Sequence, residues 1–152
     1  MAGEIIYRAS HGLAAPGGHY SHATSAGGLV FVSGQLPIAR DGTRLSDQGF
    51  ETQTLQALAN VSAALASAGS RIADLVQLRV YITDIDDWPT FDRVYSDWIG
   101  SARPARAVVP VPALHYGFCV EIEAIASLMS GQRDRMENSA LRKGLENSLS
   151  RN

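Results

Sequence analysis

The sequence predicts an α+β fold, in which a mixed sheet has two helices on one of its faces. Two segments repeat their apolar residues at helical spacing, and several others alternate apolar and polar residues as strands do. The two kinds of segment follow one another along the chain, which is typical of helices layered on a sheet. Two helices cannot cover both faces of such a sheet, so we expect the chain to associate with copies of itself.

The N-terminal part of the chain predicts short strands. Residues 5–7 form one candidate. Residues 20–25 turn at two consecutive glycines into the apolar segment 29–33, a pattern typical of a hairpin. Residues 34–37, Gly-Gln-Leu-Pro, are expected to end this pair.

Two later segments predict helices. The first covers residues 50–68, and Gly69 follows it as a C-terminal glycine commonly does. Its apolar stripe comprises Leu55, Leu58, either Val61 or Ser62, and Leu65. The second begins at Asp87, an acidic residue followed by the early proline Pro89, and Gly100 closes it. Its apolar stripe comprises Phe91, Val94, Tyr95 and Trp98.

Three further segments predict strands. Residues 75–82 alternate, and their apolar face comprises Val76, Leu78, Val80 and Ile82. Residues 105–111 also alternate, and Pro110 and Pro112 place this strand at an edge or near a strand end, because proline cannot donate to a sheet. Residues 118–129 form the last strand.

The composition excludes several classes of protein. A net charge of −2 provides no broad basic surface, so we expect no nucleic-acid partner. No apolar run approaches the roughly 20 residues that span a bilayer, so no membrane association is expected. The start of the chain lacks the basic and apolar regions of a signal peptide. The single cysteine, Cys119, is expected to be a small buried residue, which favours a cytoplasmic location.

We expect residues 1–130 to form a single domain. Residues 131–152 are polar and form a C-terminal extension. Leu141, Leu145 and Leu149 are spaced as in a short helix, and a disordered tail is the alternative.

Two short segments contain residues suited to a small polar site. Arg106 ends the run Arg-Pro-Ala-Arg on one predicted strand, and Glu121 and Glu123 share a face of another. A guanidinium binds a carboxylate through two parallel hydrogen bonds, and a second carboxylate can hold and polarise a water. This pair suits an enzyme that adds water to a small organic acid. From residue type alone, an ion pair of Arg106 at a subunit interface and two solvated glutamates are equally consistent.

Five ordered blocks, spread over about residues 14–127, match one known family. They are residues 29–35 (Leu-Val-Phe-Val-Ser-Gly-Gln), Gln53-Thr54 with Asn60, residues 80–84, Pro104-Ala105-Arg106, and residues 120–124 (Val-Glu-Ile-Glu-Ala). Together they resemble the Rid family, the reactive intermediate deaminases also called YjgF-type proteins. The resemblance implies a chorismate-mutase-like α+β fold and a homotrimer with a central barrel-like core and a cleft at each subunit interface.

The resemblance also implies roles for individual residues. Arg106 binds the substrate carboxylate, Glu121 lies close to the attacking water, and Tyr20 and Ser33 contact the substrate. The chain departs from the family pattern around the cleft at His19, His22, Asp92 and His115. We expect His19, Asp92 and His115 to contact the substrate and to influence which substrate is bound.

These observations predict an enamine or imine deaminase that converts small 2-imino acids to 2-oxo acids and ammonia without a cofactor. One alternative is a deaminase or hydrolase of the same fold with a different, pathway-specific substrate. The other is a trimeric ligand-binding or stress-protective protein without turnover. We expect no metal site, because His19, His22 and His115 lack the close spacing of zinc ligands.

Overall fold

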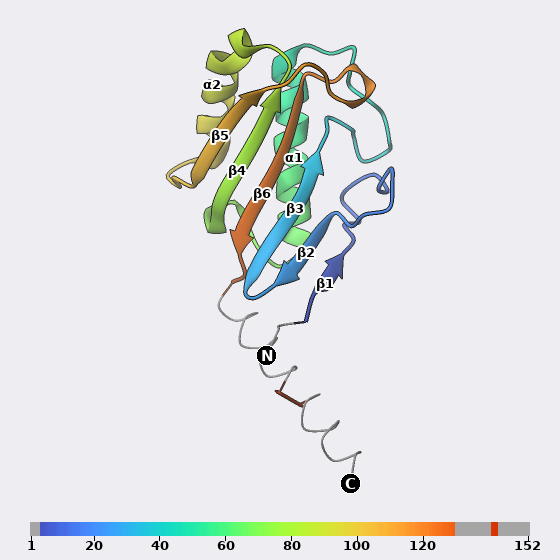
Figure 1. Ribbon diagram of the computed structural model, residues 1–152, viewed down its shortest axis with the longest axis vertical. Helices are drawn as coiled ribbons and strands as arrows, with labels where there is room; N and C mark the ends of the chain where they lie inside the picture. The colour runs from blue at the N-terminus through green and yellow to red at the C-terminus, as the bar shows by residue number, and fades with distance from the viewer. Residues whose placement is uncertain (1–3, 130–140, 143–152) are drawn as a thin grey trace.

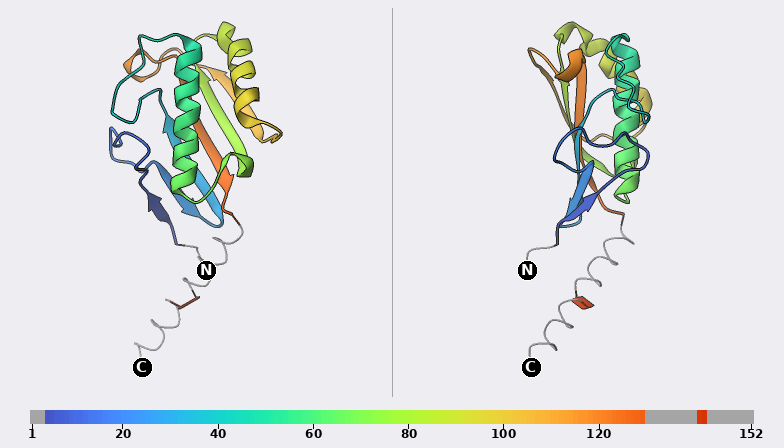
Figure 2. Two further views of the ribbon diagram at one scale, coloured as in Figure 1. Left: turned by 180° about the vertical axis from the view of Figure 1, so that it is seen from behind. Right: turned by 90° about the vertical axis from the view of Figure 1, so that its right-hand side faces the viewer.

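The computed structural model describes residues 4–129 and 141–142, and the first of these ranges forms a six-stranded mixed sheet with two α-helices on one face (Figures 1 and 2). The elements are β1 (Ile6–Arg8), β2 (Ala23–Ala26), β3 (Leu29–Gln35), α1 (Phe50–Ser67), β4 (Leu75–Ile82), α2 (Trp88–Ile99), β5 (Ala105–Pro110) and β6 (Val120–Ser127). The predicted α+β class and the placement of both helices are confirmed. The expected extension 131–152 lies outside the described residues except at Leu141 and Arg142.

The strand order is β1-β2-β3-β6-β4-β5, and every neighbouring pair is antiparallel except β4 and β5, which are parallel. This order places β5 at one edge of the sheet, as its prolines predicted. The sequence neighbours β5 and β6 are separated by β4. That separation decides where the predicted site residues lie.

The β2–β3 hairpin closes at Gly27 and Gly28, whose φ angles of 57° and 78° suit the mirror-image turns of tight hairpins. The pairing of β3 with β2 ends at Val32, before the segment 34–37 that was expected to end the hairpin, but β3 itself extends into that segment. β3 continues to Gln35, which pairs with Ile122, after a shift of register that begins at Val32. A bulge of this kind adds one residue to one strand and lets pairing resume beyond it.

The predicted apolar stripes of α1 and β4 each need one correction. On α1, Leu58, Val61 and Leu65 are fully buried, whereas Leu55 is 53% exposed because the buried face at this end runs through Gln53 and Thr54. On β4, Leu78, Val80 and Ile82 are fully buried, whereas Val76 is 47% exposed and Leu75 is buried instead. The register of β4 against β6 shifts between Leu75 and Gln77, which breaks the alternation at Val76.

The predicted stripe of α2 is confirmed. Phe91, Val94 and Tyr95 are buried, and Trp98 packs against the core while its Nε1 donates to Ser62 Oγ on α1 at 3.1 Å. Asp87 occupies the N-cap position, but its side chain makes no capping hydrogen bond. Cys119 is a free thiol of intermediate exposure rather than a fully buried residue. None of the helices in the described part of the chain is long and apolar enough to cross a membrane.

Neither α-helix lies on the other face of the sheet (Figure 2). We call this the open face. It presents a polar cluster in which Tyr81 Oη donates to Glu123 Oε1 at 2.9 Å and Arg79 Nη1 donates to the same oxygen at 3.2 Å. Beside it, Phe31 is 39% exposed. An apolar ring next to paired charges suits a surface that packs against another protein.

A buried asparagine holds the segment that follows β3 against α1. Asn60 Nδ2 donates to the carbonyl oxygens of Leu36 and Ile38, each at 2.9 Å. Gln56 Nε2 donates to Asn60 Oδ1 at 2.9 Å and fixes the orientation of the amide. The segment contains no regular strand, so these bonds replace the backbone pairing that a sheet would supply.

Asn60→Ala is expected to lower the free energy of unfolding by about 2–3 kcal/mol, because two hydrogen bonds are lost and the Ile38 carbonyl loses its partner, whereas the Leu36 carbonyl still accepts from the Ile38 backbone N–H at 2.7 Å. Gln56→Ala is the matched control and should cost about 0–1 kcal/mol, because it removes a single, more accessible bond. Urea denaturation of both variants at one protein concentration measures the difference. Equal losses would contradict the anchoring role of Asn60.

Candidate functional site

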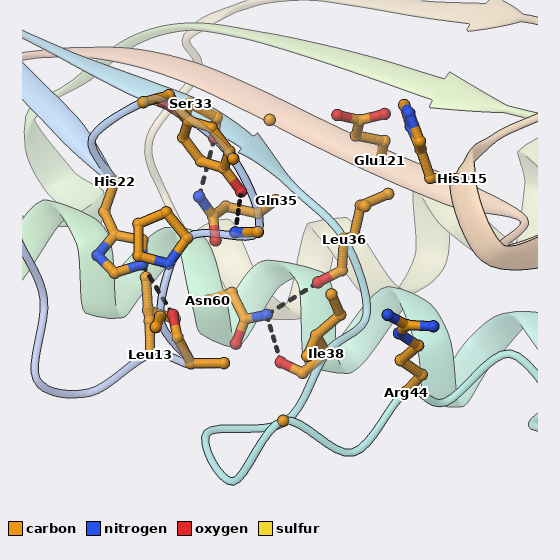
Figure 3. Close-up of a pocket in the computed structure, with 18 of the residues that line it drawn as sticks. Leu13, His22, Ser33, Gln35, Leu36, Ile38, Arg44, Asn60, His115 and Glu121 are labelled. Carbon is orange, nitrogen blue, oxygen red and sulfur yellow. Dashed lines mark hydrogen bonds between the residues drawn. The ribbon is translucent and has the colours of Figure 1, made fainter.

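A pocket of about 630 Å³ opens beside the C-terminal end of β3 (Figure 3). Its walls come from the loop 13–18, from residues 33–36 at the end of β3, and from the loop that contains Ile38 and Arg44. Tyr20, His22, Asn60, His115, Tyr116 and Glu121 complete the lining. Four of the residues that the sequence resemblance proposed for the site therefore line this one cavity: Tyr20, Ser33, His115 and Glu121.

Glu121 lies directly against the backbone of Gly34. A Cβ at Gly34 would overlap the Glu121 carboxylate, so only glycine leaves room for it here. Gly34 belongs to the bulge of β3, where the ladder to β6 is interrupted. The bulge thus makes space on the open face for the carboxylate to sit at the edge of the pocket.

The environment of Glu121 favours its protonated form more than water does. Burial raises the pKa of the Glu121 carboxyl above its ordinary value, the neighbouring His115 lowers it, and the charge of Glu123 raises it further. Figure 3 shows His115 and Glu121 side by side at one end of the pocket. A carboxylate with a raised pKa in a cavity is suited to accept a proton from a bound water.

His22 has a structural role at the back of the pocket. It is 5% exposed, its Nδ1 accepts a hydrogen bond from the Ser10 backbone N–H at 2.9 Å, and its Nε2 lies 2.9 Å from the Ala14 carbonyl oxygen. Nδ1 must be unprotonated to accept, so Nε2 carries the proton and donates to Ala14. These two bonds fix the loop 13–18 that forms one wall.

Tyr20 and Ser33 are positioned by short local bonds. Tyr20 Oη accepts from the Gly17 backbone N–H at 3.3 Å, and Ser33 Oγ donates to the Ser21 carbonyl oxygen at 2.6 Å. The Ser33 hydroxyl hydrogen is therefore occupied, which leaves its oxygen as an acceptor for a ligand. His19 is exposed and does not line the pocket.

Arg106 and Asp92 lie together on the other face of the sheet. Arg106 Nη1 donates to Asp92 Oδ1 at 2.8 Å, and its guanidinium carbon lies 4.7 Å from the ring centroid of Tyr95. Arg106 is in register with Leu78, whose side chain is buried beneath the helices, while Glu121 is in register with Tyr81 on the open face. Within one chain, the sheet separates Arg106 from Glu121.

Arg44 and Tyr116 are two of the pocket residues that the sequence prediction does not include among its site candidates. The guanidinium carbon of Arg44 lies 3.6 Å from the ring centroid of Tyr116. The available signal was the turn Asp41-Gly42, since a tight turn at Gly42 brings Ile38 and Arg44 into a β-bridge. Among the described residues, no group of three or more His, Cys, Asp or Glu side chains is arranged to hold a metal ion.

The known proteins most informative for this chain match nearly all of the sheet. The family model described as Endoribonuclease L-PSP matches residues 12–128. A RutC family protein of Pyrococcus abyssi is 35% identical over 126 residues, which cover 83% of this chain and 98% of that protein.

Solved structures agree with this assignment. RidA from the Antarctic bacterium Psychrobacter has a TM-score of 0.77 at 32% identity and covers 81% of this chain and 99% of its own. The structure of E. coli TdcF with bound serine has a TM-score of 0.75 at 30% identity and covers 82% of this chain and 99% of its own. The matched blocks, the fold and these relatives together show that the chain belongs to the Rid family.

Proposed function

We propose that this protein is an imine and enamine deaminase that hydrolyses small 2-imino acids to 2-oxo acids and ammonia. The observation that carries the proposal is the Glu121 carboxylate, partly buried against Gly34 in a pocket large enough for a metabolite. The relative TdcF was solved with bound serine, a small molecule with a carboxylate and an amino group. Its ligand supports a substrate of that class for the present chain.

In the proposed reaction a water bound beside Glu121 adds to the C2 carbon of the imine. The carboxylate accepts one proton of that water as the C–O bond forms, and the proton is passed to the nitrogen. The proton of the new hydroxyl on C2 is then transferred to the same nitrogen, the C–N bond breaks and the nitrogen leaves as ammonia, so that the C2–O bond becomes the carbonyl of the 2-oxo acid. Imines hydrolyse without a catalyst, so orienting the water and stabilising the developing charge suffices.

The substrate carboxylate is proposed to bind Arg106 of a neighbouring subunit. Arg106 and Glu121 lie on opposite faces of the sheet, so a single chain cannot present both to one small molecule. Arg106 is on the edge strand β5, and only its Nη1 is used by Asp92, which leaves Nε and Nη2 for a ligand. A homotrimer built on the open face places such clefts between subunits.

The size of the pocket favours one alternative substrate class. A volume of about 630 Å³ exceeds the need of a three-carbon imino acid and falls in the range of sites for larger ligands. A larger, pathway-specific substrate of the same reaction therefore remains the second candidate. We do not propose RNA cleavage from the description of the family model, because a net charge of −2 provides little attraction for a polyanion.

The protein is expected to be a homotrimer in solution. Light scattering at micromolar concentration should give about three times the chain mass of 16.3 kDa. The physical reason is the open face with its exposed Phe31, which a partner subunit would cover. A stable monomer with full activity would exclude a site shared between subunits.

Arg106→Ala is expected to lower kcat/KM by about 30- to 1000-fold, or roughly 2–4 kcal/mol, because a charge-assisted contact to the substrate is lost. Arg106→Lys should recover only part of this, since an ammonium cannot form the planar fork. Glu121→Gln should impair kcat more than KM. The matched control is Arg103→Ala, an exposed arginine of the same run that donates to the backbone carbonyls of Gly100 and Ala102.

Steady-state ammonia release from imino acids generated in situ measures these effects, with the spontaneous rate subtracted. Light scattering first confirms that each variant keeps its assembly. Wild-type turnover in assembled Arg106→Ala would instead favour a binding protein without this reaction.

The pH dependence of activity should report on Glu121. The ionised carboxylate holds the water, and burial raises its pKa, so kcat/KM should fall on the acid side at a pH above that of an ordinary glutamate. His115→Gln removes the group that lowers this pKa and should move the acid limb to higher pH. Two results would assign the acid limb of the kcat/KM profile to a group other than Glu121. One is an acid limb that does not move in His115→Gln, and the other is an acid limb that persists in the residual activity of Glu121→Gln.

A further inference from the structure

Arg44 is a cation on the pocket that the proposed reaction does not use. Its side chain points from the loop after β3 toward the part of the pocket where His115 and Glu121 lie, and it remains separated from them across the cavity (Figure 3). Glu121 is the only carboxylate among the residues that line this pocket. Within this pocket, Arg44 thus has room for a negative charge that a ligand could supply.

The position of Arg44 is set by Tyr116. The two stack at 3.6 Å from guanidinium carbon to ring centroid, and the ring also meets Phe118 edge-on at a centroid distance of 5.9 Å. Phe118 is 1% exposed, so the aromatic support is anchored in the interior. Stacking restricts the long arginine side chain while its N–H groups remain at the rim of the planar guanidinium.

The backbone of Tyr116 adopts an unfavourable conformation in this arrangement. Tyr116 has a φ of 60°, the only non-glycine residue with a positive φ among those described, and Gly117 follows with a φ of 75°. A bulky aromatic residue rarely adopts the left-handed region, and residues held there cluster at ligand sites. The unusual conformation presents the ring to Arg44 and to the pocket.

The hydrogen-bonding capacity of Arg44 is unused within the described part of the chain. It makes no ion pair and its guanidinium donates no side-chain hydrogen bond there, in contrast to Arg71, Arg79, Arg93 and Arg106, each of which has a carboxylate partner. A guanidinium with free donors in a fixed plane is suited to bind a carboxylate through two parallel hydrogen bonds.

We propose that Arg44 binds a second carboxylate, at the end of the substrate remote from the imine, so that the preferred substrates are 2-imino dicarboxylates. This inference rests on the proposed deaminase function for its chemistry and on the pocket alone for its binding. The imine carbon faces Glu121, the first carboxylate binds Arg106 of the neighbouring subunit, and the side chain extends through the cavity to Arg44. The excess volume of the pocket is then filled by the longer substrate.

The test compares 2-iminoglutarate with 2-iminopentanoate, which has the same chain length but lacks the terminal carboxylate. Both are generated in situ by an amino-acid oxidase, and the wild-type protein should prefer 2-iminoglutarate. Arg44→Ala should lower kcat/KM for 2-iminoglutarate by about 10- to 100-fold and leave 2-iminopentanoate within about twofold. Arg40→Ala should change neither, because Arg40, although exposed in the same loop as the equally exposed Arg44, does not line the pocket.

A binding measurement separates this inference from the proposed function. Calorimetric titration with 2-oxoglutarate and 2-oxopentanoate needs no turnover, and Arg44→Ala should weaken only the binding of 2-oxoglutarate. If neither imine is hydrolysed but this selective loss occurs, the deaminase proposal fails and the dicarboxylate site stands. Equal effects of Arg44→Ala on both compounds, or a loss of assembly in that variant by light scattering, would overturn the site.

Discussion

The unequal covering of the two faces of the sheet is the constraint on which the rest of the structure depends. Both helices pack on one face, so the core is complete there while the opposite face is left to other partners. Glu121 lies on the open face and Arg106 on the covered one. The division of these two residues between faces is the reason that the proposed site requires a second subunit.

Three residues shape the pocket mainly by holding backbone segments in place or by leaving room beside the backbone. Gly34 yields the space that Glu121 occupies, His22 holds the loop 13–18, and Asn60 holds the segment after β3. None of the three needs to touch a substrate to be essential to the cavity. A polar site built on strand ends and pinned loops keeps its geometry without a large rearrangement on binding.

Much of the fold followed from periodicity. The limits of α1 agree with its predicted range to within one residue, because regular apolar spacing and a terminal glycine mark a helix directly. The bulges at Val76 and Gly34 did not follow, since one inserted residue changes which side chains face the core. The resemblance placed Glu121 in the pocket. It left open the face occupied by Arg106, because that face follows from the register of β5 against β4, which pairs Arg106 with the buried Leu78.

The central claim is that Glu121 of one subunit and Arg106 of another act on the same substrate. Mixing tests it most directly: Glu121→Gln and Arg106→Ala, each impaired alone, are unfolded together in equal amounts and refolded into mixed assemblies. In a closed ring of three with heterologous interfaces, about a quarter of the sites then combine an intact Glu121 of one subunit with an intact Arg106 of the next. A site shared between subunits therefore predicts that turnover recovers to about a quarter of the wild-type level. Activity no higher than the mean of the two variants, in assemblies proven to be mixed by mass spectrometry, would contradict the account.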